Sequence, residues 1–231
     1  MVSEEYLTHN LHSFSKLYSG GYGGVYPESH IIRFYVRVLT HGFGIDGSGR
    51  QKLLDLGCGT GAHALFFKSK GFDVYGVDIA EAAIKECREI MPDIQNNFKL
   101  ISPKPSSKSF FDVKYDVIIA NQVLYYFSNS DFHKILQSLY EQLKPGGVFY
   151  ATMIGSSHHL YNNSFPCYDG LYKVIPDKRL SDVITYVNFV HSIKELEEKF
   201  KYFKKRHIGY YDMILGNAEG SDYHYIYIGE K

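Results

Sequence analysis

Apolar residues are arranged along this chain in two patterns, short continuous runs and one-sided stripes at helical spacing. The runs at residues 53–56, 72–77 and 113–120 are typical of buried parallel strands, in which both faces are covered. Between them, residues 62–70 consist of good helix formers, and residues 81–90 place their apolar side chains on one face. Strand and helix therefore alternate, which predicts an α/β fold with a parallel sheet.

The same patterns continue towards the C-terminal part of the chain. Residues 98–101 and 148–154 predict two more strands, and residues 131–143 predict a surface helix with one apolar face. Residues 207–214 and 223–228 alternate apolar and polar side chains around a glycine-containing turn, as an antiparallel hairpin does. We predict a Rossmann-like, doubly wound sheet of about seven strands, mostly parallel with a C-terminal antiparallel hairpin.

The length of the chain predicts a single domain. Its 231 residues suffice for one sizeable core and are few for two, and no repeat or domain boundary interrupts them. Residues 1–45 read as two helices joined by a glycine-rich stretch with two tyrosines, which we interpret as an N-terminal lid. Residues 155–182 have no regular pattern, so we expect them to form a substrate-side insertion.

A glycine-rich turn follows the first predicted strand. Gly57, Gly59 and Gly61 alternate with other residues, so the backbone can turn sharply and approach a ligand closely. Asp78 ends the next strand about 20 residues downstream, where an acid meets the ribose hydroxyls in dinucleotide folds. The glycine spacing alone does not distinguish such a ligand from a nicotinamide cofactor. Asp55, however, stands just before the turn, where it would repel a pyrophosphate and suits a ligand with an ammonium and a sulfonium group.

These residues resemble the first motif of the class I S-adenosylmethionine-dependent methyltransferases. The resemblance rests on the run Asp-Leu-Gly-Cys-Gly-Thr-Gly at 55–61, on Asp78, on residues 115–121 and on residues 143–147. It implies S-adenosyl-L-methionine as cofactor and methyl transfer as the reaction. The cofactor-binding residues that we expect are Tyr26, Arg33, Asp55, Gly57, Cys58, Gly59, Gly61, Asp78, Ile79, Ser102 and Asn121.

The resemblance assigns a part of the cofactor to several of these residues. Tyr26 and Arg33 stand about two helical turns apart and are expected to clasp the cofactor carboxylate, as in proteins resembling glycine N-methyltransferase; otherwise Arg33 is a solvated helix residue. Ser102 stands where family members often place an acid for the adenine amino group. Asn121 is expected at the methionine end, or else as a turn cap. Cys58 is expected to serve mainly by being small.

The expected acceptor site is built from aromatic residues and two histidines. Tyr125 and Tyr126 follow the fourth strand at the edge where doubly wound sheets bind ligands, although one of them is as readily a core residue. Methyltransferases that act on bases or glutamine amides resemble one another in an Asn/Asp-Pro-Pro-Tyr run here, which this chain lacks. A hydroxyl acceptor needs a base, and we predict His158 and His159 as catalytic, with solvated loop histidines as the alternative. The substrate-binding residues that we expect are Tyr125, Tyr126, Tyr161 and Tyr168.

Composition narrows the function further. Lysine plus arginine and aspartate plus glutamate each number 25, so the formal net charge is zero and no basic face favours a nucleic-acid partner. Three cysteines without paired spacing argue against a zinc site, and we expect no metal. No apolar run approaches the roughly 18 residues of a membrane span, so we expect a soluble, cytoplasmic protein without a membrane partner.

We therefore predict methyl transfer to a small molecule, with an oxygen of a polar metabolite or sugar-like intermediate as acceptor. Two alternatives remain at this point. A nicotinamide-dependent oxidoreductase would use the same glycine turn and would be favoured by a second βαβ half. A non-catalytic protein would bind the cofactor without turnover. The sequence leaves the oligomeric state open.

Overall fold

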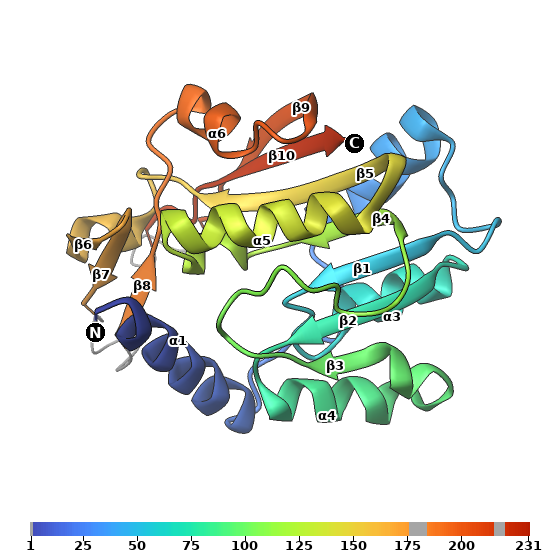
Figure 1. Cartoon of the computed structure of the whole chain (residues 1–231), viewed down its shortest axis with the longest axis horizontal. Coiled ribbons are helices and arrows are strands. Elements are labelled where there is room, and N and C mark those ends of the chain that lie inside the picture. Colours follow the sequence, from blue (N-terminus) through green and yellow to red (C-terminus); the bar gives the residue numbers. More distant parts are fainter. Residues whose placement is uncertain (1, 176–183, 215–219) are drawn as a thin grey trace.

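The computed structural model describes residues 2–175, 184–214 and 220–231. Within them, the chain forms a seven-stranded central sheet in the order β3-β2-β1-β4-β5-β10-β9 (Figure 1). The first five strands of this order are parallel, as their continuous apolar runs predict. The strands are β1 (Lys52–Leu56), β2 (Asp73–Asp78), β3 (Phe98–Leu100), β4 (Tyr115–Ala120), β5 (Leu143–Ile154), β9 (Lys204–Tyr211) and β10 (His224–Glu230).

Strand β10 runs against the rest of this sheet. It pairs antiparallel with β5 on one side and with β9 on the other. The predicted C-terminal hairpin is therefore confirmed. Its second strand, β10, pairs with β5, and its first strand, β9, lies at the edge of the sheet. The prediction of a Rossmann-like sheet that is mostly parallel is confirmed as well.

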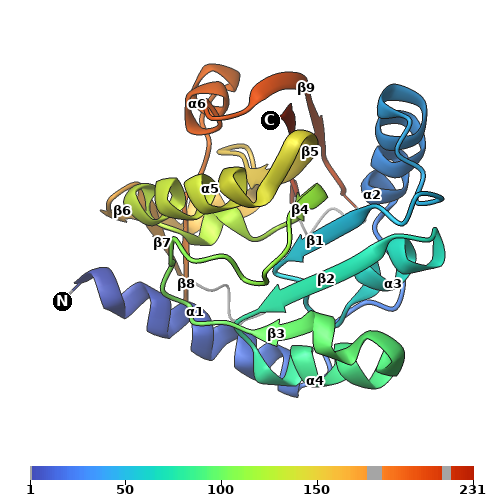
Figure 2. The same ribbon diagram turned by 45° about the vertical axis from the view of Figure 1, so that its right-hand side comes forward.

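Helices cover both faces of the central sheet (Figures 1 and 2). Leu53 and Leu54 are neighbours in β1 and belong to different core clusters, because successive side chains of a strand point to opposite faces. Helices α5 and α6 pack on the face of Leu54, and α3, α4 and the segment from α2 to η1 pack on the face of Leu53. The helices are α1 (Val2–Ser19), α2 (Ser29–Arg33), the π-helix η1 (Phe34–Phe43), α3 (Ala62–Ser69), α4 (Glu81–Ile90), η2 (Pro92–Asn97), η3 (Leu124–Tyr126), α5 (Asn129–Gln142), η4 (His159–Asn163) and α6 (Ile193–Lys199).

The beginnings of two surface helices have identifiable caps. Helix α5 begins two residues before the predicted position, because Ser128 Oγ accepts a hydrogen bond from the Asp131 amide. Ser192 caps α6 in the same way by accepting from the Glu195 amide at 3.2 Å. Both caps satisfy amide groups that have no partner within the helix.

The segment expected to be irregular, residues 155–182, forms regular structure over much of its described part. Strands β6 (Ser164–Tyr168), β7 (Leu171–Val174) and β8 (Thr185–Val187) make a small antiparallel sheet. The expectation of an irregular segment is wrong here because Asp169 and Gly170 both have positive φ and close a two-residue hairpin turn. Residues 176–182 of the expected insertion lie outside the described residues.

Helix α1 joins this small sheet to the central one. It lies beside β8 at the carboxyl ends of the parallel strands (Figures 1 and 2). Asn10 holds it there: its Oδ1 accepts from the Tyr186 amide at 3.2 Å, and its Nδ2 donates to the Tyr126 carbonyl at 3.3 Å. Within the described parts of the chain, no helix is both long and apolar enough to cross a bilayer.

Candidate active site

The glycine turn is fastened to the end of β2 by backbone hydrogen bonds. The amides of Gly57 and Cys58 donate to the Val77 carbonyl at 2.8 and 3.1 Å. Asp78 Oδ2 accepts from the Gly59 amide, and its Oδ1 accepts from the Ala80 amide, both at 2.9 Å. Burial raises the pKa of Asp78 above its ordinary value, although these amide donors oppose the shift. Asp78 therefore fixes the turn while lying at the floor of a cavity.

This first cavity has the character of a nucleoside site. Apolar side chains from α1, β1, β2, η3 and the segment after β3 surround it, and the carboxylate of Asp78 is the acidic group in its lining. Gly57 has a φ of 71°, and a Cβ there would lie 2.7 Å from Val123 Cγ2, so the turn lies close against its surroundings. An acid beside an apolar slot fits a ribose attached to a flat base. The residues lining the cavity include Phe14, Tyr18, Leu56, Gly57, Asp78, Ile79, Ile101, Pro103, Tyr126 and Phe127.

A second cavity of about 550 Å³ lies over the glycine turn and adjoins the first. One of its walls is the glycine-rich arm at residues 21–26, and the opposite wall is residues 121–126 after β4. Thr60 closes the arm against the turn: its Oγ1 donates to the Gly24 carbonyl at 3.4 Å. Gly57 and Tyr126 line both cavities, so the two lie side by side. We call this second cavity the acceptor cleft.

Glu28 is the charged centre of the acceptor cleft, and the sequence did not single it out. Its Oε2 lies 2.9 Å from His63 Nε2 and accepts from Asn121 Nδ2 at 2.7 Å. Its Oε1 accepts from Gln122 Nε2 at 3.1 Å. Burial alone would raise the pKa of Glu28, but the bonds from His63 and Asn121 and the nearby His30 ring outweigh burial and lower it. Glu28 is thus held as a carboxylate.

His63 is the imidazole that lines the acceptor cleft. Burial alone would lower its pKa, but the hydrogen bond to Glu28 and the charge of Asp55 outweigh burial and raise it. Asp55 lies below the turn, 1% exposed, and its Oδ2 has no hydrogen-bond partner among the described residues. Burial raises the pKa of Asp55 to about 6, and the neighbouring His63 limits that shift.

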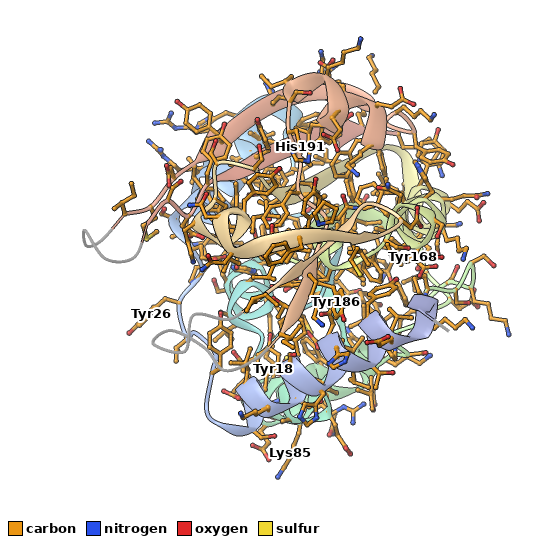
Figure 3. The ribbon with its side chains drawn as sticks, turned by 90° about the vertical axis from the view of Figure 1, so that its left-hand side faces the viewer. Tyr18, Tyr26, Lys85, Tyr168, Tyr186 and His191 are labelled. Atoms are coloured by element: carbon orange, nitrogen blue, oxygen red, sulfur yellow. The ribbon has the colours of Figure 1, made fainter. Side chains whose placement is uncertain are left out.

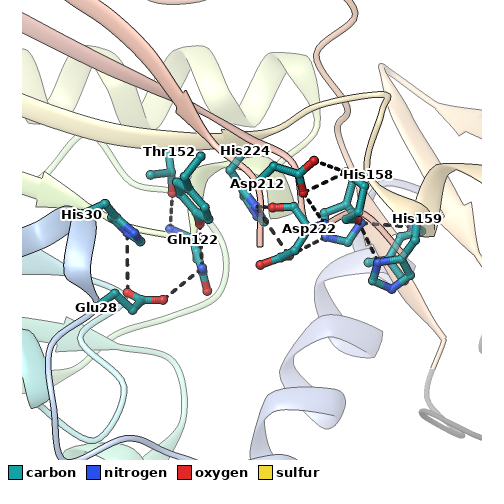
Figure 4. A network of polar contacts seen from close by, with 12 residues as sticks. Glu28, His30, Gln122, Thr152, His158, His159, Asp212, Asp222 and His224 are labelled. Carbon is teal, nitrogen blue, oxygen red and sulfur yellow. Dashed lines mark hydrogen bonds and ion pairs between the residues drawn. The ribbon is translucent and has the colours of Figure 1, made fainter. Parts of the chain in front are cut away.

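A second polar cluster lies beside the cleft, around Asp222 (Figure 4). His158 Nε2 lies 2.8 Å from Asp222 Oδ1, and His224 Nδ1 lies 3.6 Å from the same oxygen. His158 Nδ1 accepts from the Leu160 amide at 3.1 Å, so the ring proton is on Nε2 and is donated to Asp222. This tautomer makes His158 Nε2 a donor rather than a metal ligand, because ligating histidines donate from their other nitrogen.

Stacked rings connect the two clusters. Tyr211 lies between His30, at 4.3 Å between ring centroids, and His224, at 5.0 Å, with interplanar angles of 10° in both pairs. The Tyr211 hydroxyl accepts from Gln122 Nε2 at 2.8 Å. Gln122 is held in a left-handed conformation with φ 53°, and its amide donates to Thr152 Oγ1 at 2.7 Å (Figure 4). The strand β9 thereby supports Gln122, which lines both cavities.

Many of the predicted site residues come together at this edge of the sheet. Asp78 and Ile79 line the first cavity. Asp55 is buried below the turn, and Gly61 packs against Cys87 with a φ of 89°. Those that line the acceptor cleft are Tyr26, Gly57, Cys58, Gly59, Asn121, Tyr125 and Tyr126.

The remaining predicted residues do not line either cavity. Arg33 and Ser102 are exposed. Tyr161 packs against Tyr172 and Phe189, and Tyr168 lies on the small sheet, away from Tyr26 (Figure 3). His158 is 4% exposed, with both nitrogens engaged as described, and His159 Nδ1 lies 3.1 Å from the Ser221 carbonyl. Roles for these residues in binding or catalysis stay predictions.

Comparison with known proteins identifies relatives of the chain. The family described as "Methyltransferase domain" matches residues 28–209. A carboxy-S-adenosyl-L-methionine synthase of Aliivibrio fischeri is 26% identical over 102 residues, which are 42% of this chain and 42% of that protein. A ubiquinone biosynthesis O-methyltransferase of Pseudomonas putida is 26% identical over 106 residues, which are 45% of this chain and 44% of that protein. The chain thus spans less than half the length of the curated relatives that it matches.

Solved structures share the fold over most of the chain. An S-adenosylmethionine-dependent methyltransferase of Methanosarcina mazei is 20% identical with a TM-score of 0.66, covering 89% of this chain and 98% of that one. The 1,6-didemethyltoxoflavin-N1-methyltransferase of Burkholderia thailandensis, solved with 1,6-didemethyltoxoflavin and S-adenosylhomocysteine, is 17% identical with a TM-score of 0.68. It covers 99% of this chain and 90% of that one.

The family match includes the glycine turn, Asp78 and the strands from β1 to β5, whereas α1 and the arm at residues 21–26, which also line the cavities, precede the matched residues. It extends over more than half of the chain, and the seven-stranded, mostly parallel sheet agrees with the sequence-based prediction of the fold. The chain belongs to the methyltransferase-domain family, and it is a member of the class I S-adenosylmethionine-dependent type.

Proposed function

We propose that this protein transfers the methyl group of S-adenosyl-L-methionine to a small molecule bound in the acceptor cleft. The observation that carries the proposal is that the two cavities lie side by side and share Gly57 and Tyr126 in their linings. One cavity offers the acid and apolar slot of a nucleoside site, and the other offers tyrosines and a charged pair. Methyl transfer needs the cofactor and its acceptor side by side, because positioning supplies much of the rate.

The residues for the cofactor are those at the ends of β1 and β2. Asp78 would accept from the ribose hydroxyls, and Ile79 would border the base. Gly57, Cys58 and Asn121 would surround the methionine part. When bound, S-adenosyl-L-methionine supplies an electrophilic methyl group on a positively charged sulfur. Residues 1–45 would act as a lid within a single domain, because the arm at 21–26 lies over the turn.

For the acceptor atom we propose an oxygen, as the sequence favours, and this choice requires a base. His63 is better placed for that role than the predicted pair His158 and His159, because it lines the cleft. Donation from its Nε2 to Glu28 leaves the lone pair on Nδ1, which can take the hydroxyl proton. Glu28 would fix this tautomer, as the acid does in acid–histidine pairs.

Calorimetry with three ligands tests the proposal. S-adenosyl-L-methionine and S-adenosylhomocysteine should bind at micromolar levels, and NAD should give no measurable heat. Binding of NAD alone would instead support the oxidoreductase, which the reversed strand β10 already disfavours by replacing a second βαβ half. Binding of S-adenosyl-L-methionine without methyl transfer to any member of a broad acceptor panel would favour a non-catalytic role.

A further inference from the structure

Apart from His63, the charged side chains that line the two cavities are negative. Among the described lining residues, the carboxylates are Glu28 and Asp78, and there is no lysine or arginine. Two more carboxylates lie close by, Asp55 below the turn and Asp222 beside the cleft. An anionic molecule entering the cleft would therefore be repelled by these carboxylates, and His63, the group among the described lining residues that can carry a positive charge, is already paired with Glu28.

Glu28 has room for one more hydrogen-bond donor. Its Oε2 accepts from His63 and Asn121, whereas its Oε1 accepts from Gln122 alone among the described residues. A carboxylate oxygen has two lone pairs, so Oε1 retains one acceptor position. The Glu28 side chain is 36% exposed and lines the cleft, so a ligand can reach that position. The three protein donors hold the carboxylate in place before any ligand arrives.

Aromatic rings form a continuous row along the same cleft. Tyr22 contacts Tyr18 at 5.9 Å between centroids, Tyr18 contacts Phe14 at 6.5 Å, and Phe14 contacts Tyr126 at 4.9 Å. Tyr126 contacts Tyr125 at 4.5 Å. Tyr26, 86% exposed on the arm, lies at the mouth. The faces of such rings carry negative potential and attract cations, most of all cations that hydrate weakly.

From the placement of Glu28 among these rings, we propose that the acceptor carries a positively charged nitrogen, a protonated amine or a quaternary ammonium, which binds in the cleft between Glu28 and the tyrosines. This inference rests on the proposed function and names the substrate class of the same site. The charged nitrogen is the group by which the acceptor is recognised, separate from the oxygen that would receive the methyl group. The same charges disfavour acceptors that carry a phosphate or carboxylate in place of the charged nitrogen.

Four small ligands that share an aromatic ring and differ in the charge of their polar group test this inference. The probes are benzylammonium, benzyltrimethylammonium, benzyl alcohol and benzoate, titrated by ligand-observed NMR into protein saturated with S-adenosylhomocysteine. Both cations should bind at least about tenfold more tightly than benzoate. The affinity of benzyl alcohol should lie between that of the cations and that of benzoate. Benzoate binding as tightly as the cations would overturn the inference while leaving the proposed function intact. Failure of S-adenosylhomocysteine to bind would overturn the proposed function itself, and this inference with it.

Two variants locate the selectivity in the cleft. Glu28→Gln should reduce the preference for cations over benzoate at least about fivefold, and Glu86→Gln, an exposed glutamate on α4, should leave it unchanged. Tyr26→Leu keeps bulk at an exposed position that does not threaten folding, and should weaken benzyltrimethylammonium binding about threefold. An unchanged preference in both Glu28→Gln and Tyr26→Leu would overturn the inference. So would loss of S-adenosylhomocysteine binding in Glu28→Gln with unchanged selectivity, because Glu28 would then serve the cofactor.

Discussion

Glu28 and His63 form an ion pair at 2.9 Å that joins the N-terminal arm to the helix after the glycine turn. Glu28 precedes α2, and His63 lies in the first turn of α3, so the pair connects segments that are distant in sequence. Their pKa values shift in opposite directions, downwards for Glu28 and upwards for His63. Each shift favours the charged form of its residue, so the pair stabilises the folded chain.

The first prediction concerns the pH dependence of this pair. The raised pKa of His63 gives stability that is complete below its ordinary value of 6.5 and is lost as pH rises through the raised value. The lowered pKa of Glu28 gives stability that is complete above 4.5 and is lost as pH falls through the lowered value. The stability difference between wild type and Glu28→Gln should therefore shrink by about 0.5–1 kcal/mol from about pH 5.5 to about pH 9.

Urea unfolding at both pH values measures this difference, with Glu86→Gln as the control on an exposed face of α4. NMR titration adds a direct readout, since Glu28→Gln should lower the pKa of His63. A stability difference that does not vary with pH would mean that the two charges are not coupled.

The second prediction concerns Asp78. Asp78→Asn should weaken binding of S-adenosylhomocysteine by about 1.5–3 kcal/mol, because a charged acceptor for two hydroxyls is lost. Calorimetry measures the change, and Asp93→Asn, which alters an exposed acid paired with Lys68, is the control. Equal affinities for wild type and Asp78→Asn would place the ribose contact elsewhere.

The third prediction concerns the closure of the arm. A Cβ on Gly23 would lie 2.5 Å from Thr60 Cγ2, whereas a Cβ on Gly21 would meet open space, and both glycines have positive φ. Gly23→Ala and Gly21→Ala each place a Cβ on a residue with positive φ, and only the first brings it against Thr60. We expect Gly23→Ala to weaken S-adenosylhomocysteine binding about fivefold more than Gly21→Ala does, which corresponds to about 1 kcal/mol of binding free energy.

Limited proteolysis at residues 20–24 gives a second measurement of the arm. Added cofactor should slow cleavage of the wild type and should protect Gly23→Ala less. If both alanine variants behave alike in binding and in proteolysis, the contact between Gly23 and Thr60 does not control closure.

The fourth prediction separates the candidate bases. On an acceptor found by screening, His63→Asn should lower turnover about 10²–10⁴-fold with little effect on S-adenosylhomocysteine affinity. Turnover of the wild type should rise with pH through the raised pKa of His63, because the base must be neutral. The double replacement of His158 and His159 by asparagine is the comparison. A larger loss in the double variant than in His63→Asn would return the catalytic role to those two histidines.

Local pattern was enough to predict the sheet and the glycine turn that follows β1. The glycine turn, Asp55 and Asp78 are each recognisable because the turn and the strand ends are encoded within a few residues. The hairpin at Asp169 and Gly170 carried a usable signal, a two-residue Asp-Gly turn, but the aromatic residues around it do not alternate cleanly with polar ones.

The acceptor side could not be predicted in the same way. In the sequence, Glu28 follows a proline and is typical of a helix start, and His63 is typical of a surface position in a helix. Their meeting depends on how the arm folds back over the turn, which no local pattern specifies. His158 was expected to face the acceptor because it follows β5, but Asp222 and the Leu160 amide engage both of its nitrogens.

The position of β10 has a consequence for how the protein assembles. Strand β9 precedes β10 in the chain, yet β10 lies between β5 and β9, so β9 cannot hydrogen-bond to the sheet until β10 has been synthesised and inserted. During translation, β1 to β5 can form while Tyr211, which stacks on His30 and accepts a hydrogen bond from Gln122 behind the acceptor cleft, is still absent. The nascent chain should therefore acquire its affinity for the nucleoside before it acquires its selectivity for the acceptor.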